Sequence, residues 1–181
     1  VEAKEIRHNL RHQLMMENVD DVIVVNRYDL QGMSEDVLNK GVHTILSEPM
    51  VDDVYLEDYP VPDDYHVFAI EYLPGQYDVR ADFAEQCFQL LTEEKGVKVR
   101  CARLYVVKGV SDEDIPAIEN YLINPVDSRL ASLAKPESLD DANIDIKPVP
   151  IIEGFTNFSK EELEHYLAQN GMAMNYDDLK V

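Results

Sequence analysis

Few residues of this 181-residue chain have the types and spacing that chemistry requires. His8 and His12 stand four residues apart and could chelate a metal ion from one helix face, but no glutamate stands between them as it does in zinc proteases. Histidines on a solvated helix face are the plainer interpretation. Cys87 falls on the apolar stripe of an expected helix over 79–92, and Cys101 falls in an expected strand. Buried cysteines usually act as small hydrophobic residues, so core packing is favoured over a nucleophilic role.

Other catalytic patterns are weak. The chain has seven glycines and contains neither a phosphate-binding loop nor the Gly-x-Ser-x-Gly turn of a nucleophilic serine. An independent hydrolase that uses Cys87 or His66 has only residue identity in its favour. We therefore predict no catalytic residue and no metal site within this chain.

Two short stretches concentrate polar and aromatic residues at the ends of expected elements. The first is the turn over 73–82, with Gln76, Tyr77 and Arg80 as candidate contact residues. It is either a plain turn with Asp78 as the helix N-cap or an exposed binding loop, since loops held by rigid elements often carry function. The second stretch runs from 124 to 129, and its candidates are Asn124, Asp127, Ser128 and Arg129.

Charge and composition exclude several classes of partner. The 36 acidic and 16 basic residues give a formal charge of −20, which would repel nucleic acid or an anionic membrane surface. No run approaches the roughly 18 apolar residues of a membrane span, and the N-terminal sequence lacks the pattern of a signal peptide. The two cysteines form neither a disulfide framework nor a metal-ligand cluster. These features predict a soluble cytoplasmic protein.

The elements that must position these residues are duplicated. Shifting the chain by about 77 to 78 residues aligns two similar halves. The matched segments are Val1–Ala3 with Val79–Ala81, Val22–Val25 with Val99–Leu104, and Gly32–Asp36 with Gly109–Glu113. Each Gly-x-Ser-acid-acid segment is typical of a strand that ends at glycine and a helix capped by serine. Helices are expected over 35–47 and 112–123, each ending before a proline.

The repeat predicts an α+β sandwich of two tandem β-α-β-α-β units. The strand over 66–73 precedes the second unit, and the first unit lacks its counterpart, so we expect one more strand upstream of Val1. An acidic, proline-broken loop over 52–64 joins the units, and a solvated loop is favoured there over a calcium site. The predicted domains are a duplicated domain over 1–127, an extended connection over 128–157 and the start of a helical domain over 158–181. In the last of these, Ser159 and Glu162 form a capping box.

Together these motifs resemble the N-terminal region of the large single-chain phosphoribosylformylglycinamidine synthases of de novo purine synthesis. The segments that carry the resemblance are Glu71–Leu91, Tyr121–Arg129, Asn26–Asp29, Ser47–Pro49 and Phe158–Met174. They span nearly the whole chain, and the last resembles the start of the family's linker domain.

The resemblance implies a fold similar to a tandem fusion of two PurS subunits, which agrees with the repeat found from the residues. It implies a whole enzyme that uses ATP, magnesium and glutamine, with the glutaminase and synthetase domains of the same chain as partners. The family's catalytic residues match no position here, so this fragment is expected to be inactive and to hold no cofactor itself. Its expected role is to hold those domains together and to line the ammonia route. The alternative is a stand-alone regulatory module that binds a small molecule between its two units.

Overall fold

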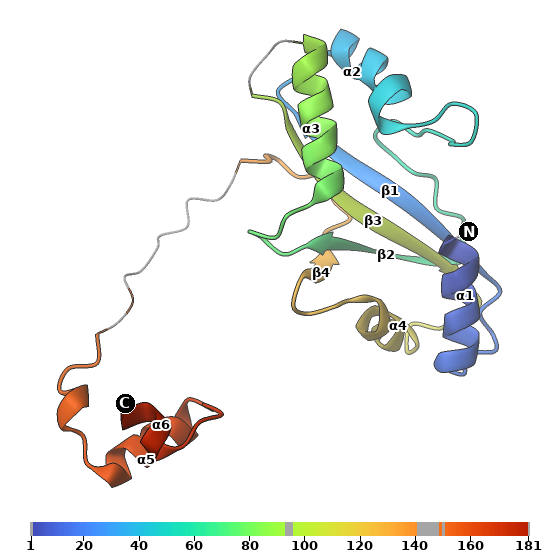
Figure 1. The fold of residues 1–181 in the computed structure, drawn as a ribbon. Helices are drawn as coiled ribbons and strands as arrows, with labels where there is room; N and C mark the ends of the chain where they lie inside the picture. The colour runs from blue at the N-terminus through green and yellow to red at the C-terminus, as the bar shows by residue number, and fades with distance from the viewer. Residues whose placement is uncertain (1, 93–95, 141–148, 150, 181) are drawn as a thin grey trace. The chain divides into compact units, whose positions relative to one another are not determined.

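The computed structural model describes residues 2–92, 96–140, 149 and 151–180 (Figure 1). Its internal contacts divide the chain into two compact units, Val1–Asp140 and Asp141–Val181. The first unit is an α+β sandwich, which confirms the predicted fold class. It extends beyond the expected boundary after residue 127, because residues 128–131 form a strand of its sheet.

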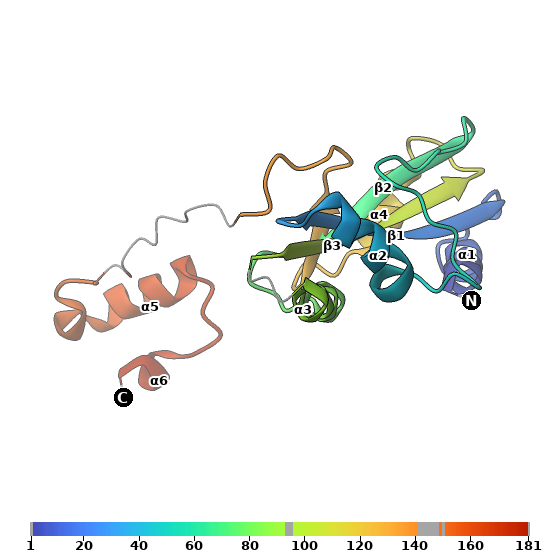
Figure 2. The ribbon, with the colours of Figure 1, turned by 90° about the horizontal axis from the view of Figure 1, so that it is seen from above.

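The sheet of the first unit has four antiparallel strands in the order β1-β3-β2-β4. Their bounds are Asp21–Gln31 for β1, Tyr65–Tyr72 for β2, Lys98–Lys108 for β3 and Ser128–Ala131 for β4. Figure 2 shows β1, β3 and β2 side by side. The two strands matched by the repeat, β1 and β3, pair with each other along their full lengths. The central pairing of the sheet therefore joins the two halves of the sequence.

The first unit contains four α-helices, which lie in two pairs. They are α1 (Glu2–Gln13), α2 (Glu35–Gly41), α3 (Val79–Thr92) and α4 (Ile115–Leu122). The α2 helix continues as a π-helical segment, η1 (Val42–Leu46), and both pack against α3. Figure 1 shows α2 and α3 at one end of the sheet and α1 and α4 at the other. Each pair thus combines one helix from each repeat.

The two helices expected over 35–47 and 112–123 start differently. Ser34 caps α2 as predicted, because its side chain accepts a hydrogen bond from the N–H of Val37. The prediction that Ser111 caps the other helix is wrong, since α4 begins three residues later than expected, after Asp114. Pro116 explains the difference: proline fits the first turn of a helix but would clash with the preceding turn further inside.

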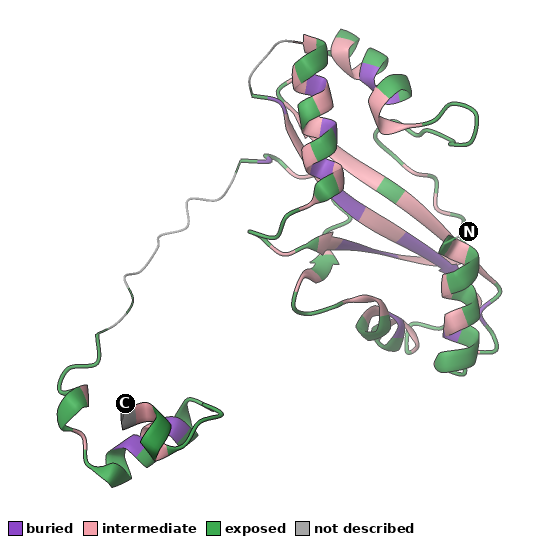
Figure 3. Ribbon diagram, in the orientation of Figure 1, coloured by how far each residue is buried: buried purple, intermediate pink, exposed green. Residues whose placement is uncertain are grey.

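The buried residues lie where the helices meet one face of the sheet (Figure 3). Leu10 of α1 and Ile118 of α4 are fully buried in one cluster with side chains from all three long strands. The sheet residues of that cluster are Val22, Phe68, Ile70, Tyr105 and Val107. Burial of such side chains contributes roughly 1.5 to 3 kcal/mol each. The core under α1 and α4 is therefore built from residues of both repeats.

The fifth element of the first repeat is missing. A strand was expected after Pro49, but residues 47–64, all of which the structure describes, contain none. Its counterpart in the second repeat, β4, pairs with β2. The described chain offers no counterpart of β2 in the first repeat, so a strand here would lack a partner, and Pro60 and Pro62 cannot donate to a sheet ladder.

The second unit contains η2 (Phe155–Asn157), α5 (Lys160–Gln169) and α6 (Tyr176–Lys180). The predicted capping box is confirmed: Ser159 and Glu162 exchange both of its hydrogen bonds at the start of α5. Of the expected extended connection over 128–157, residues 141–148 and 150 lie outside the described residues.

Candidate functional site

The structure brings the two predicted contact stretches together at one edge of the sheet. The N–H of Leu73 donates to the carbonyl oxygen of Asp127 at 2.8 Å. In the pairing of β2 with β4, Tyr72 lies opposite Ser128 and Glu71 opposite Arg129. Residues 71–80 and 124–129 therefore form one continuous surface, which we call the candidate edge.

The turn between β2 and α3 is held by its own hydrogen bonds. The Asp78 side chain accepts the N–H of Arg80 at 3.0 Å and of Ala81 at 3.1 Å, which confirms its role as the N-cap of α3. The Tyr77 hydroxyl donates to Asp82 at 2.7 Å. That hydrogen bond raises the pKa of Tyr77. The Tyr77 side chain is nevertheless 68% exposed, so the turn holds an exposed aromatic ring in a fixed position.

Arg80 points from the first turn of α3 toward the centre of the sheet. Its guanidinium donates to the side-chain oxygen of Asn26 on β1. Sequence analysis did not select Asn26 as a site residue. Asn26 lies opposite Arg103 in the pairing of β1 with β3, and this register is known only from the structure. Arg80 is thus bound within the fold, in addition to being half-exposed beside the turn.

Cys101 lies near Arg80 and is not suited to nucleophilic chemistry. Its side chain is buried, and burial followed by the negative charge of Asp78 raises the pKa of the thiol to about 12. Only a thiolate is an effective nucleophile, so the protonated form dominates at neutral pH. The prediction of a packing role for Cys101 agrees with this environment.

The loop between α4 and β4 is also closed on itself. The Asn124 side chain donates to Asp127 at 3.0 Å and accepts the N–H of Val126 at 3.2 Å. The Ser128 hydroxyl donates to the carbonyl oxygen of Asn124 at 3.0 Å. Arg129 reaches across to Glu71, with its terminal nitrogen 2.7 Å from the carboxylate. These polar groups are satisfied locally, and they fix the shape of the edge.

Exposed apolar side chains surround these polar residues. Phe83 is 63% exposed on α3 and Val126 is 75% exposed in the loop before β4. The other exposed apolar members are Tyr72, Val79 and Leu130. Apolar surface that gathers on one part of a protein often marks an interaction site. Sequence analysis did not select these residues, because an apolar side chain in a strand or helix gives no sign of which neighbours will cover it.

The remaining candidates do not assemble into a site. The rings of His8 and His12 lie with their centroids 4.2 Å apart and their planes tilted by 48° on an exposed helix face. His66 pairs with Asp112 at 3.2 Å, but the Asp112 side chain is 95% exposed. Within the described ranges, no group of three or more His, Cys, Asp or Glu side chains is placed to hold a metal ion.

No helix among the described residues has the length and apolar character needed to cross a membrane. Comparison of the chain with family models, curated proteins and solved structures gave no match.

Proposed function

We propose that this chain is an N-terminal accessory region of an ATP- and glutamine-dependent ligase of the cytoplasm. The ligase converts formylglycinamide ribonucleotide to formylglycinamidine ribonucleotide in de novo purine biosynthesis. In this proposal the chain performs no chemistry. It docks the glutaminase and synthetase domains and helps to keep the ammonia route dry, and ATP and magnesium bind elsewhere in the whole enzyme.

The sequence resemblance supports this proposal, and the paired contacts of the two repeats are compatible with it. In the family, the N-terminal domain is similar to two fused PurS subunits. Here, Gly32 and Gly109 occupy matched positions, with φ of +83° and +84°. Each packs so closely on a backbone segment, at Gly96 and Asn18 respectively, that a Cβ atom would overlap it. Gly96 and Asn18 are themselves matched by the repeat, as two fused copies of one subunit would require.

The observation that carries the docking role is the candidate edge itself. Its polar groups are held by hydrogen bonds within the turn and the loop, while Tyr77, Phe83 and Val126 stay exposed beside them. A rigid surface with exposed aromatic and apolar side chains suits a permanent contact with another domain. Nothing on this edge resembles an acid, a base or a nucleophile arranged for catalysis.

A complementation experiment tests the proposal. The purified chain is mixed with the remainder of the candidate ligase, expressed without it. Synthesis of the amidine product is then measured with glutamine and, separately, with ammonia. We expect the chain to restore the glutamine-dependent rate and to change the ammonia-dependent rate much less. A chain that neither binds the remainder nor restores that rate would point to the stand-alone module instead.

Gln76→Ala is the sharpest variant for this assay. Gln76 is exposed, and the hydrogen bond described for it runs from its backbone N–H to Leu73, so the substitution should leave the fold intact. Arg80→Ala should weaken complementation too, but it also removes the contact with Asn26. Gln89→Ala, further along α3, is the matched control and should complement like the wild type, because the Gln89 amide donates to Glu85 of the same helix and not to the turn. Equal loss in Gln76→Ala and Gln89→Ala would contradict a role specific to the turn.

A further inference from the structure

The sheet face opposite the helices carries a small charged hollow. It measures about 190 Å³ and lies between the strands and the segment that follows β4. Arg27 and Asp29 of β1, Arg100 of β3 and Glu71 of β2 line its floor, and residues 131, 132 and 134–136 form its rim. Glu71 also belongs to the candidate edge, whereas Arg27, Asp29 and Arg100 lie outside it, so the hollow goes beyond the proposed function.

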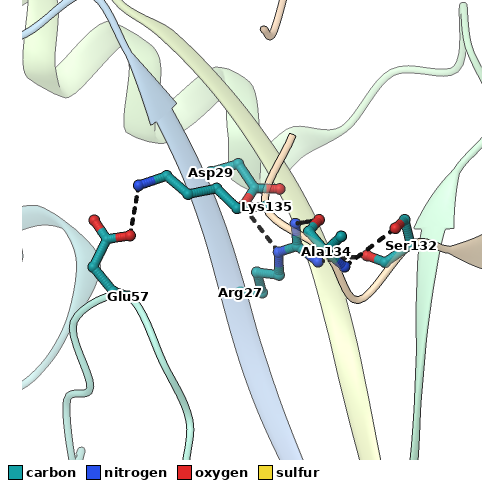
Figure 4. Close-up of polar contacts among 6 residues, drawn as sticks. All are labelled: Arg27, Asp29, Glu57, Ser132, Ala134 and Lys135. Atoms are coloured by element: carbon teal, nitrogen blue, oxygen red, sulfur yellow. Dashed lines mark hydrogen bonds and ion pairs between the residues drawn. The ribbon is translucent and has the colours of Figure 1, made fainter. Parts of the chain in front are cut away.

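The Arg27 guanidinium donates hydrogen bonds from all three of its nitrogens, two of them to the rim (Figure 4). Its Nε donates to Asp29 at 2.9 Å, and its two terminal nitrogens donate to the carbonyl oxygens of Ser132 at 2.7 Å and Ala134 at 3.2 Å. The chain after β4 is therefore fastened over the sheet by one guanidinium. Both the Arg27 and the Asp29 side chains are only 17% exposed.

The other charges around the hollow are also paired. Glu71 binds Arg129 at 2.7 Å, and Lys135 turns outward to Glu57 at 2.5 Å (Figure 4). These pairs neutralise the carboxylates that would otherwise repel an anion from the hollow.

Arg100 is the lining residue whose charge is not paired within the described residues. It lies directly opposite Asp29 in the register of β1 and β3, where an ion pair across the strands would be expected. Arg27 has captured Asp29 instead. Within the described part of the chain, Arg100 has no ion pair or side-chain hydrogen bond, and no buried side-chain nitrogen or oxygen lacks a partner. The Arg100 guanidinium is therefore half-buried but open to the hollow.

We propose that this hollow binds one small oxyanion through the Arg100 guanidinium. The planar fork of arginine matches phosphate and carboxylate groups and binds either with two parallel hydrogen bonds. Pockets for drug-sized ligands usually measure about 300 to 1,000 Å³. At about 190 Å³, this hollow suits an ion or a single acidic group rather than a nucleotide.

Titration of the isotope-labelled 181-residue chain by NMR tests the proposal. Sodium phosphate, sodium acetate and sodium chloride are added in separate arms at constant ionic strength, since salt screens charge in all of them. We expect phosphate or acetate, but not chloride, to give saturable shifts at Arg100, Ser132 and Ala134, with a dissociation constant in the millimolar range. Whichever of the two binds more tightly identifies the preferred oxyanion.

Matched variants decide whether Arg100 is the ligand. Arg100→Gln should raise the dissociation constant by about tenfold or more. Arg103→Gln lies on the same strand but on the opposite face and should bind like the wild type. If Arg100→Gln fails to fold by circular dichroism, Ala131→Leu narrows the rim without changing any charge and should weaken binding by about fivefold or more. Absence of saturable shifts, an equal response to chloride, or unchanged affinity in the decisive variant would overturn the proposal.

Discussion

Asn26 of β1 and Arg103 of β3 lie directly opposite each other at the midpoint of their strand pairing. Each is bonded to the first turn of a helix. Asn26 accepts a hydrogen bond from Arg80 at the start of α3, and Arg103 donates to Glu2 at the start of α1 at 2.5 Å. Glu2 and Arg80 are matched by the sequence repeat. A local two-fold axis therefore passes between Asn26 and Arg103 and relates β1 and the start of α1 to β3 and the start of α3.

The matched glycines at the strand ends should be essential for stability. Gly109→Ala would place a residue at a φ of +84° and drive its Cβ into the backbone at Asn18. We expect Gly109→Ala to lower the free energy of unfolding by about 3 kcal/mol or more, because backbone strain and overpacking act together. Urea unfolding of the purified variants measures this loss.

Gly75→Ala provides the comparison. Gly75 has a similar φ of +88°, but no heavy atom lies within 4 Å of the added Cβ. Gly75→Ala should lower the free energy of unfolding by about 1 kcal/mol, from backbone strain alone. Similar losses for Gly75→Ala and Gly109→Ala would show that the close approach to Asn18 contributes nothing.

The packing of Phe88 against Gly41 should make the effects of substitutions at these two positions on stability interdependent. Gly41 lies in α2 with ordinary helical dihedrals, so alanine would be favoured there by about 1 kcal/mol on helix propensity. The new Cβ would instead overlap the buried Phe88 ring, and overpacking costs about 1 to 3 kcal/mol. We therefore expect Gly41→Ala to destabilise the chain.

Phe88→Leu should rescue Gly41→Ala. In the other repeat, Leu10 matches Phe88 and Ile118 matches Gly41, and these two residues share one core cluster. That pair has a smaller side chain in place of Phe88 and a larger one in place of Gly41. Phe88→Leu alone should cost about 1 to 2 kcal/mol because it leaves a cavity. A double-mutant cycle should give a favourable coupling of about 1 kcal/mol or more, whereas strict additivity would sink this interpretation.

The two cysteines should differ in reactivity. Cys101 is buried with a pKa raised to about 12, while Cys87 is partly exposed on α3. At pH 8, iodoacetamide should modify Cys101 at least about a hundredfold more slowly than Cys87, as read by mass spectrometry. Both should react alike in denaturant. Because the folded pKa of Cys101 is raised, its contribution to stability is present below the ordinary thiol pKa and is lost as the pH rises toward 12.

The boundary of the first unit can be tested by truncation. A chain that ends at residue 140 keeps β4, the hydrogen bonds from Arg27 to Ser132 and Ala134, and the buried Leu139. A chain that ends at residue 126 loses all three, and we expect it to be less stable by about 3 kcal/mol. Equal urea midpoints for the two chains would show that the segment after residue 127 adds nothing to the fold.

Sequence patterns predicted the parts of the fold that depend on local chemistry. The cap at Asp78 and the capping box at Ser159 follow from side chains that bond their own helix starts. The start of α4 was misplaced because the preference of Pro116 for the first turn outweighed the serine cap at Ser111.

The hollow over Arg100 could not have been predicted in this way. Its rim is fastened by bonds from Arg27 to backbone carbonyl oxygens, which every residue type possesses, so no side chain of the rim signals the contact. The unpaired state of Arg100 depends in turn on the strand register, which places two arginines near one aspartate.

The strand order β1-β3-β2 has a consequence for how the chain folds as it is synthesised. β3 is the partner of both β1 and β2, yet it follows both of them in the sequence. A nascent chain that has emerged only as far as α3 holds two strands without their common partner. Formation of the sheet must therefore wait for Lys98–Lys108, and such late, long-range pairing is typical of domains that fold in milliseconds to seconds rather than microseconds.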